Sequence, residues 1–250
     1  MLRPLHWNRP GRFLLAFVLA VVAVVCPIHL LAVESSAKKP FFEERPMVVI
    51  DPGHGGSDEG AAGPSGSREK DVVLRLAEQV AVLLEDRFQV ELTRTGDYGM
   101  DLPQRTGTAN RYPAALFLSL HTAASQAPHV SGVFFYYHRP IASVAAVTSK
   151  KTEITAWENL QDRHREQSRR LAQKLARQWK TRFPGDEVTV AGHPLPVLEG
   201  ADMPAVLVEA GTLTHAADEL RLADMEHLKT VAAVLAEGVA SFLKAGGAAP

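Results

Sequence analysis

The chain has 250 residues, of which 46% are hydrophobic and 22% charged, and its formal net charge is −1. This length and composition are typical of one globular domain with some additional chain. The near-neutral net charge implies no surface that binds polyanions, so we expect no nucleic-acid partner.

The N-terminal segment has the pattern of an export signal. Three arginines precede an apolar run over residues 13–33, and small residues follow where a signal peptidase cuts. We predict a cleaved signal peptide over residues 1–32, a linker over residues 33–46, and an exported protein that is periplasmic or extracellular. The alternative is an uncleaved anchor, in which residues 13–33 hold the chain in the membrane. Cys26, the only cysteine, lies in this segment, so a metal in the mature chain must bind to His, Asp or Glu.

From residue 47 onward, short apolar runs alternate with amphipathic segments. This alternation predicts a single α/β domain over residues 47–244, with a twisted, mostly parallel sheet and helices on both faces, and a frayed tail over residues 245–250. Ser67 and Asp101 are expected to be helix N-caps. The predicted strands cover residues 47–50, 89–94, 115–121, 132–138, part of 187–198, and 205–209, and the predicted helices cover 69–86, 102–111, 168–183 and 224–243.

Side chains that bind metals occur at the ends of predicted strands. His54 and His121 each follow an apolar strand, and Glu69 lies in the first turn of a helix. Because sites in parallel sheets gather at the strand ends, these side chains are expected to converge. Two histidines and one carboxylate, with a fourth position left for water, are the ligand set of a catalytic zinc. Each residue also has a simpler interpretation, as a structural histidine or as a carboxylate favoured by the helix dipole.

Six motifs follow one another along the chain. They are Ile50–Gly56, Glu69–Asp71, Thr93-Arg94, Leu102 with Arg105 and Asn110, Ser119–His121, and Pro204–Gly211. In order and spacing they resemble the zinc-dependent N-acetylmuramoyl-L-alanine amidases of the Amidase_3 type, which act on bacterial cell walls. The resemblance extends from residue 47 to about residue 243.

This resemblance implies zinc-dependent hydrolysis of the amide bond between N-acetylmuramic acid and L-alanine in peptidoglycan. It assigns the zinc ligands to His54, Glu69 and His121 and the catalytic base to Glu209, for which a buried ion pair is the alternative. The residues after His121 and after Glu209 depart from the usual family pattern without removing a ligand or the base. Two other functions remain open: a zinc peptidase that cuts stem peptides, and a non-catalytic module that binds the wall or regulates another enzyme.

The segment over residues 141–160, which is Ala/Val-rich at first and highly charged from Lys150, separates a predicted strand from the next firm helix. It contains Trp157 among few large apolar residues, with Glu153 and Glu158 on either side. In the similar periplasmic division amidases, an insertion in the comparable place forms a helix that covers the zinc until an activator displaces it. The resemblance therefore implies a lid over the zinc and an activator protein as partner. The alternative is an exposed charged helix at the edge of the domain.

Two further interpretations concern residues outside the ligand set. Arg94 and Arg105 are expected to be structural ion-pair partners of Asp97 or Asp101 rather than contacts to the substrate. The aromatic stripe Phe134–Tyr137 is expected to lie in the core rather than to stack on sugar rings.

Overall fold

A computed structural model describes residues 45–127, 129–140 and 157–246. The predicted signal peptide or anchor, nearly all of the predicted linker and residues 141–156 of the predicted lid lie outside this range. None of the helices that the structure describes has both the length and the apolar character needed to cross a membrane.

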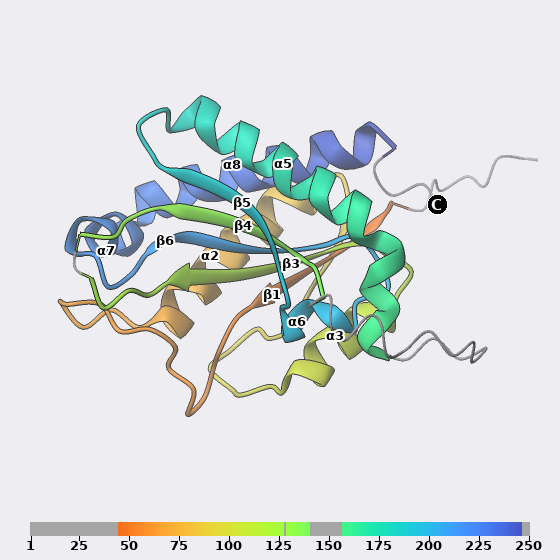
Figure 1. Cartoon of the computed structure of the whole chain (residues 1–250), viewed down its shortest axis with the longest axis horizontal. Helices are drawn as coiled ribbons and strands as arrows, with labels where there is room; N and C mark the ends of the chain where they lie inside the picture. Colours follow the sequence, from red (N-terminus) through yellow and green to blue (C-terminus); the bar gives the residue numbers. More distant parts are fainter. Residues whose placement is uncertain (1–44, 128, 141–156, 247–250) are drawn as a thin grey trace, which may run out of the picture. The chain divides into compact units, whose positions relative to one another are not determined.

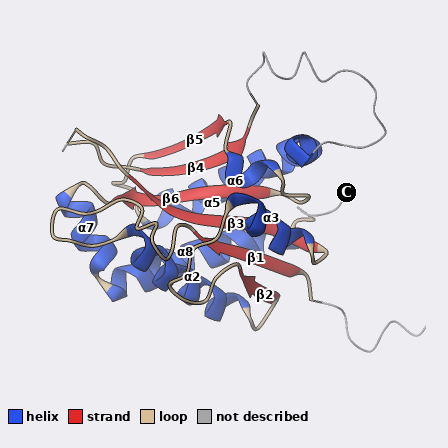
Figure 2. Ribbon diagram, turned by 90° about the horizontal axis from the view of Figure 1, so that it is seen from below, coloured by secondary structure: helices blue, strands red, loops and turns tan. Residues whose placement is uncertain are grey.

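The described strands form one six-stranded sheet with the order β2-β1-β3-β6-β4-β5, shown in Figure 2. All neighbouring strands are parallel except β4 and β6, which are antiparallel. The predicted mostly parallel sheet is therefore confirmed. The strands are β1 (Met47–Pro52), β2 (Gln89–Leu92), β3 (Ala114–Ala123), β4 (Val133–His138), β5 (Val188–His193) and β6 (Ala205–Thr212).

Helices cover both faces of the sheet, as predicted (Figures 1 and 2). Three long helices lie on one face, two shorter ones lie on the other, and the remaining two lie at opposite ends of β6. The three long helices are α2 (Glu69–Leu84), α5 (Arg165–Arg182) and α8 (Met225–Lys244). The two shorter helices on the other face are α3 (Leu102–Asn110) and α6 (Pro196–Glu199). The two at the ends of β6 are α7 (Ala216–Ala223) and the 3₁₀ helix η1 (Trp157–His164).

The strand periodicity divides the apolar side chains between two cores. Val48 and Ile50 of β1 point into the larger core, under the three long helices, whereas Val49 points into the smaller core, under α3 and α6. Successive strand residues face opposite sides of a sheet, so a strand buried on both sides is a continuous apolar run. This explains why Met47–Ile50 shows no alternation in the sequence.

Several element boundaries differ from the sequence predictions. β3 and β6 continue beyond His121 and Glu209, helices α6 and α7 were not predicted, and α5 begins before residue 168. The prediction that Ser67 caps α2 is wrong, because the N-cap is Arg68 and no side chain caps the helix. The preceding loop takes this role, since the carbonyl groups of Ala61 and Glu59 accept from the first amides of α2. Asp101 does cap α3, accepting from the Gln104 amide at 2.8 Å.

Candidate metal centre

His54 lies on the tight turn that follows β1. Its φ angle of 59° is in the left-handed region, which non-glycine residues seldom adopt and which is often found at functional sites. Arg105 Nη2 donates to the His54 carbonyl oxygen at 2.8 Å and holds this backbone in place. The ring is oriented by Asp58, whose Oδ2 lies 2.9 Å from His54 Nδ1. This leaves Nε2 of His54 directed at Glu69.

The Glu69 carboxylate is the centre of the cluster. Its Oε1 lies 3.1 Å from Nε2 of His54 and 3.0 Å from Nδ1 of His121. Two backbone amides hold the carboxylate: Thr122 N–H donates to Oε1 and Ala61 N–H donates to Oε2, both at 2.8 Å. Glu69 itself is only 3% exposed. The side chain is therefore fixed in position before any metal binds.

These three side chains fit a zinc ion. One ligand atom from each lies within 4.8 Å of the others, and no other such group of three or more occurs in the described part of the chain. Tetrahedral zinc with bonds of ~2.0–2.1 Å places its ligand atoms roughly 3.3 Å apart, close to the separations from Glu69. A nitrogen, nitrogen and oxygen donor set with an open fourth position is also the composition of catalytic zinc sites.

Two glycines make room for this arrangement. A Cβ atom on Gly53 would overlap the imidazole ring of His121. At Gly60, where φ is +68°, a Cβ atom would lie 2.7 Å from both Glu69 Oε2 and His54 Cδ2. The backbone can therefore pass this close to the ligands only where no side chain is present.

The charges of the cluster are matched. Burial alone would raise the pKa of the Glu69 carboxyl, but its contacts with His121 and His54 outweigh burial and hold that pKa well below its ordinary value. Burial lowers the pKa of His54, yet hydrogen bonds to Glu69 and Asp58 outweigh it and raise the pKa overall. Both ring nitrogens of His54 face carboxylate oxygens, which makes this a place that favours a cation.

Glu209 lies beside the cluster but is not part of it. Its Cα pairs with that of His121 across β3 and β6, so both side chains project from the same face of the sheet. Burial raises the pKa of the Glu209 carboxyl. A carboxyl group that lies beside a metal site without being a ligand is placed to accept a proton and return it.

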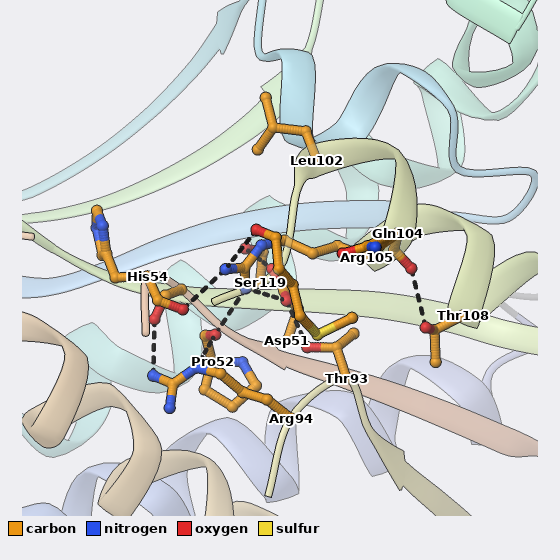
Figure 3. Close-up of polar contacts among 12 residues, drawn as sticks. Asp51, Pro52, His54, Thr93, Arg94, Leu102, Gln104, Arg105, Thr108 and Ser119 are labelled. Atoms are coloured by element: carbon orange, nitrogen blue, oxygen red, sulfur yellow. Dashed lines mark hydrogen bonds and ion pairs between the residues drawn. The ribbon is translucent and has the colours of Figure 1, made fainter. Parts of the chain in front are cut away.

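Arg94 and Arg105 are structural, as predicted, but their predicted partners are wrong (Figure 3). Arg105 pairs with the fully buried Asp51 at 2.8 Å rather than with Asp101, and Arg94 donates to the carbonyl oxygens of Pro52 and Gly53 rather than to Asp97. The tight turn presents carbonyl groups to the interior, and each must find a donor. Asp97 pairs instead with Lys70, at 2.8 Å.

A buried glutamate on α7, which the sequence analysis missed, fixes the loop before Glu69. Glu219 is 1% exposed and accepts from the backbone amides of Ser65 and Ser67 at 2.8–3.0 Å. The partners lie more than 150 positions apart in the chain, so no local pattern predicts the contact. Asp58 was also missed, although its position four residues after His54 is a local signal for a residue that orients the imidazole.

Comparison with known proteins identifies this arrangement. Residues 48–241 match the family Amidase_3, N-acetylmuramoyl-L-alanine amidase. The chain belongs to this family. It is 31% identical to the N-acetylmuramoyl-L-alanine amidase AmiA of Escherichia coli K12, over 78% of this chain and 75% of that protein. The match to an E. coli AmiC is 30% identical and covers 81% of this chain but only 54% of that protein.

Solved amidase structures share the fold. AmiC2 of Nostoc punctiforme is 30% identical, with a TM-score of 0.66, over 80% of this chain and 98% of that one. The catalytic domain of CwlV from Paenibacillus polymyxa is 28% identical, with a TM-score of 0.67 over the same shares. The protein is therefore an N-acetylmuramoyl-L-alanine amidase that hydrolyses peptidoglycan, in a family that depends on zinc. Because peptidoglycan lies in the cell envelope, the enzyme is exported.

Proposed function

We propose that His54, Glu69 and His121 hold the zinc and that Glu209 transfers the proton when the bond between the muramic acid lactyl group and L-alanine is hydrolysed. The observation that carries this assignment is the convergence of the three ligand atoms within 4.8 Å, with Glu209 opposite His121 on the neighbouring strand. Family membership supports the same reaction.

The side chains have separate tasks in this reaction. When bound, zinc polarises the amide carbonyl and makes water a stronger nucleophile. Glu209 takes the proton from the attacking water and delivers it to the leaving nitrogen, so one carboxylate serves both proton transfers. Glu69 is held by two amides and His54 by Asp58, so the ligands need little reorganisation.

Removal of zinc is expected to abolish activity, and added zinc is expected to restore it. The test is digestion of isolated sacculi by the purified domain with a chelator, and then with zinc, with the products identified by mass spectrometry. Free glycan with intact stem peptides is the expected product. Shortened stems would indicate the zinc peptidase, and no product at any zinc concentration would indicate the non-catalytic module. Activity that resists the chelator in a zinc-free protein would overturn the metal assignment.

We also propose the finer location and the regulation that the sequence predicts. The enzyme is periplasmic or extracellular, and residues 13–33 are its membrane contact if they are not cleaved. An activator protein regulates it by acting on a lid over residues 141–160. Most of this segment, including Glu153, lies outside the described residues. Trp157 and Glu158 begin η1, whose residue Gln161 donates to the carbonyl oxygens of Ala201 and Met203.

The lid hypothesis has a direct test. Because Ala201 and Met203 precede β6, Gln161, which directly follows the segment, is attached at the opposite end of this strand from the metal centre. Replacement of residues 141–156 by a short Gly/Ser linker leaves this attachment in place. If the segment is a lid, the variant should cleave soluble wall fragments faster with unchanged zinc content. Equal or lower activity in a folded, zinc-loaded variant would contradict the hypothesis.

A further inference from the structure

The sheet face that carries His121 and Glu209 continues across β4 and β5. The Cα atom of Glu209 pairs with that of Phe134, which in turn pairs with Thr189. Paired residues on neighbouring strands project from the same face, so these four residues form one row across four strands. With strands ~4.8 Å apart, the row extends roughly 14 Å from His121 to the edge strand β5.

Two aromatic side chains form a wall along this face. The rings of Phe134 and Tyr136 are stacked, with centroids 5.7 Å apart and planes 9° from parallel, and His193 contacts Tyr136 edge-on at 5.1 Å. Both aromatic residues are only half-buried, whereas Phe135 between them is fully buried against Trp179. Among the described residues, Phe134 packs against neither of the two hydrophobic cores. The prediction that the aromatic stripe lies in the core is therefore wrong for Phe134, whereas Tyr136 packs against the smaller core.

The phenol of Tyr136 adds a polar group to this wall. Tyr136 is half-buried, and its hydroxyl group is not one of the buried polar atoms left without a partner in the described part of the chain. Burial and the nearby charge of Glu209 raise the pKa of Tyr136 to about 12, so the phenol keeps its proton throughout the neutral range. A hydrogen-bond donor is therefore available next to the proposed catalytic carboxylate.

We infer that Phe134 and Tyr136 line a subsite for the stem peptide, on the leaving-group side of the scissile amide. This inference rests on the proposed function. If Glu209 protonates the leaving nitrogen, that nitrogen lies next to Glu209, with the carbonyl group on the side of the zinc ligands. The peptide attached to the nitrogen then continues away from the ligands, across the face formed by β4 and β5.

The dimensions and chemistry of the wall suit this occupant. An extended peptide advances ~3.3–3.6 Å per residue, so about four residues cover the row from the metal centre to β5. The Phe134 ring offers an apolar surface to the short aliphatic side chains of a stem peptide. Tyr136 O–H can donate to a peptide carbonyl, which an apolar wall alone would leave unsatisfied. The glycan then lies on the other side of the scissile bond, toward the loop that contains His54.

Substrates that differ in peptide length test the inference. The probes are N-acetylmuramoyl-L-alanine and an N-acetylmuramoyl tetrapeptide, and the readout is the ratio of their kcat/KM values with the zinc-loaded enzyme. The wild type is expected to favour the tetrapeptide. Phe134→Ala should reduce this preference about tenfold, the lower range for one apolar contact, and Phe134→Tyr should keep it. Tyr136→Phe should also lower the preference, because it removes one hydrogen-bond donor.

Tyr137→Phe is the matched control for Tyr136→Phe. It removes a hydroxyl group from the next residue of β4, which faces the opposite side of the sheet, and it should leave the preference for the tetrapeptide unchanged. Thermal unfolding and zinc content show whether each variant is folded and loaded. Equal losses on both substrates in Phe134→Ala would overturn the inference. If the wild type released no alanine or peptide from either substrate, the proposed function itself would fail.

Discussion

Glu209→Gln is expected to lower kcat on sacculi by at least ~10²-fold, the lower range for loss of a general acid-base catalyst, while the enzyme keeps its zinc. Glutamine has nearly the same shape but can neither accept the proton of the attacking water nor return it to the nitrogen. Glu209 is outside the group of ligand atoms, so its replacement leaves the metal site complete. The measurement is the rate of peptide release, with zinc content from elemental analysis of the same preparation.

Three further variants separate catalysis from metal binding. Glu69→Gln and His121→Ala remove a ligand atom, so both are expected to lose zinc as well as activity. Glu78→Gln makes the same change of charge at an exposed position on α2 and should alter neither. If Glu209→Gln released peptide at nearly the wild-type rate, or if it lost zinc to the same extent as His121→Ala, the assignment of Glu209 to proton transfer would be wrong.

Local sequence patterns predicted the parts of the site that depend on local structure. His54 and His121 each follow an apolar run, and Glu69 begins an amphipathic helix, so the strand and helix ends alone placed them together. The partners of Arg105 and Glu219 were not predictable in this way, because hydrophobic periodicity carries no information about which distant group meets a buried charge. Arg105 and Asp51 are separated by 54 residues in the sequence, and Glu219 and its partners are separated by more than 150.

The aromatic stripe shows a different limit. A strand of aromatic and β-branched residues predicts burial, and Phe135 is buried. Whether the alternate face is also covered depends on which helices pack there. Since α3 and α6 are short, Phe134 and Tyr136 stay half-exposed on the metal face. Whether the side chains on both faces of a strand are buried thus depends on the length and placement of the helices that pack there, which the strand sequence does not encode.

Arg105→Ala is expected to lower the free energy of unfolding by ~3–5 kcal/mol, the range for removal of one partner of a buried ion pair. The Arg105 side chain is 5% exposed and that of Asp51 is fully buried, so the remaining carboxylate would lose its ion-pair partner and keep only the nearby charge of Arg94. Thr93 and Ser119 would still donate to Asp51, at 2.6 and 2.8 Å, but neither compensates its charge. Urea unfolding, with the midpoint compared at constant m-value, measures the loss.

The same variant is expected to weaken zinc binding, because Arg105 also donates to the carbonyl oxygens of Pro52 and His54, each at 2.8 Å. These two bonds hold the turn on which His54 adopts its left-handed backbone conformation. Arg111→Ala, at the exposed C-terminal end of the same helix, is the control and should change stability by no more than ~0.5 kcal/mol. If the two alanine variants unfolded at the same urea concentration, the ion pair with Asp51 would not stabilise the turn.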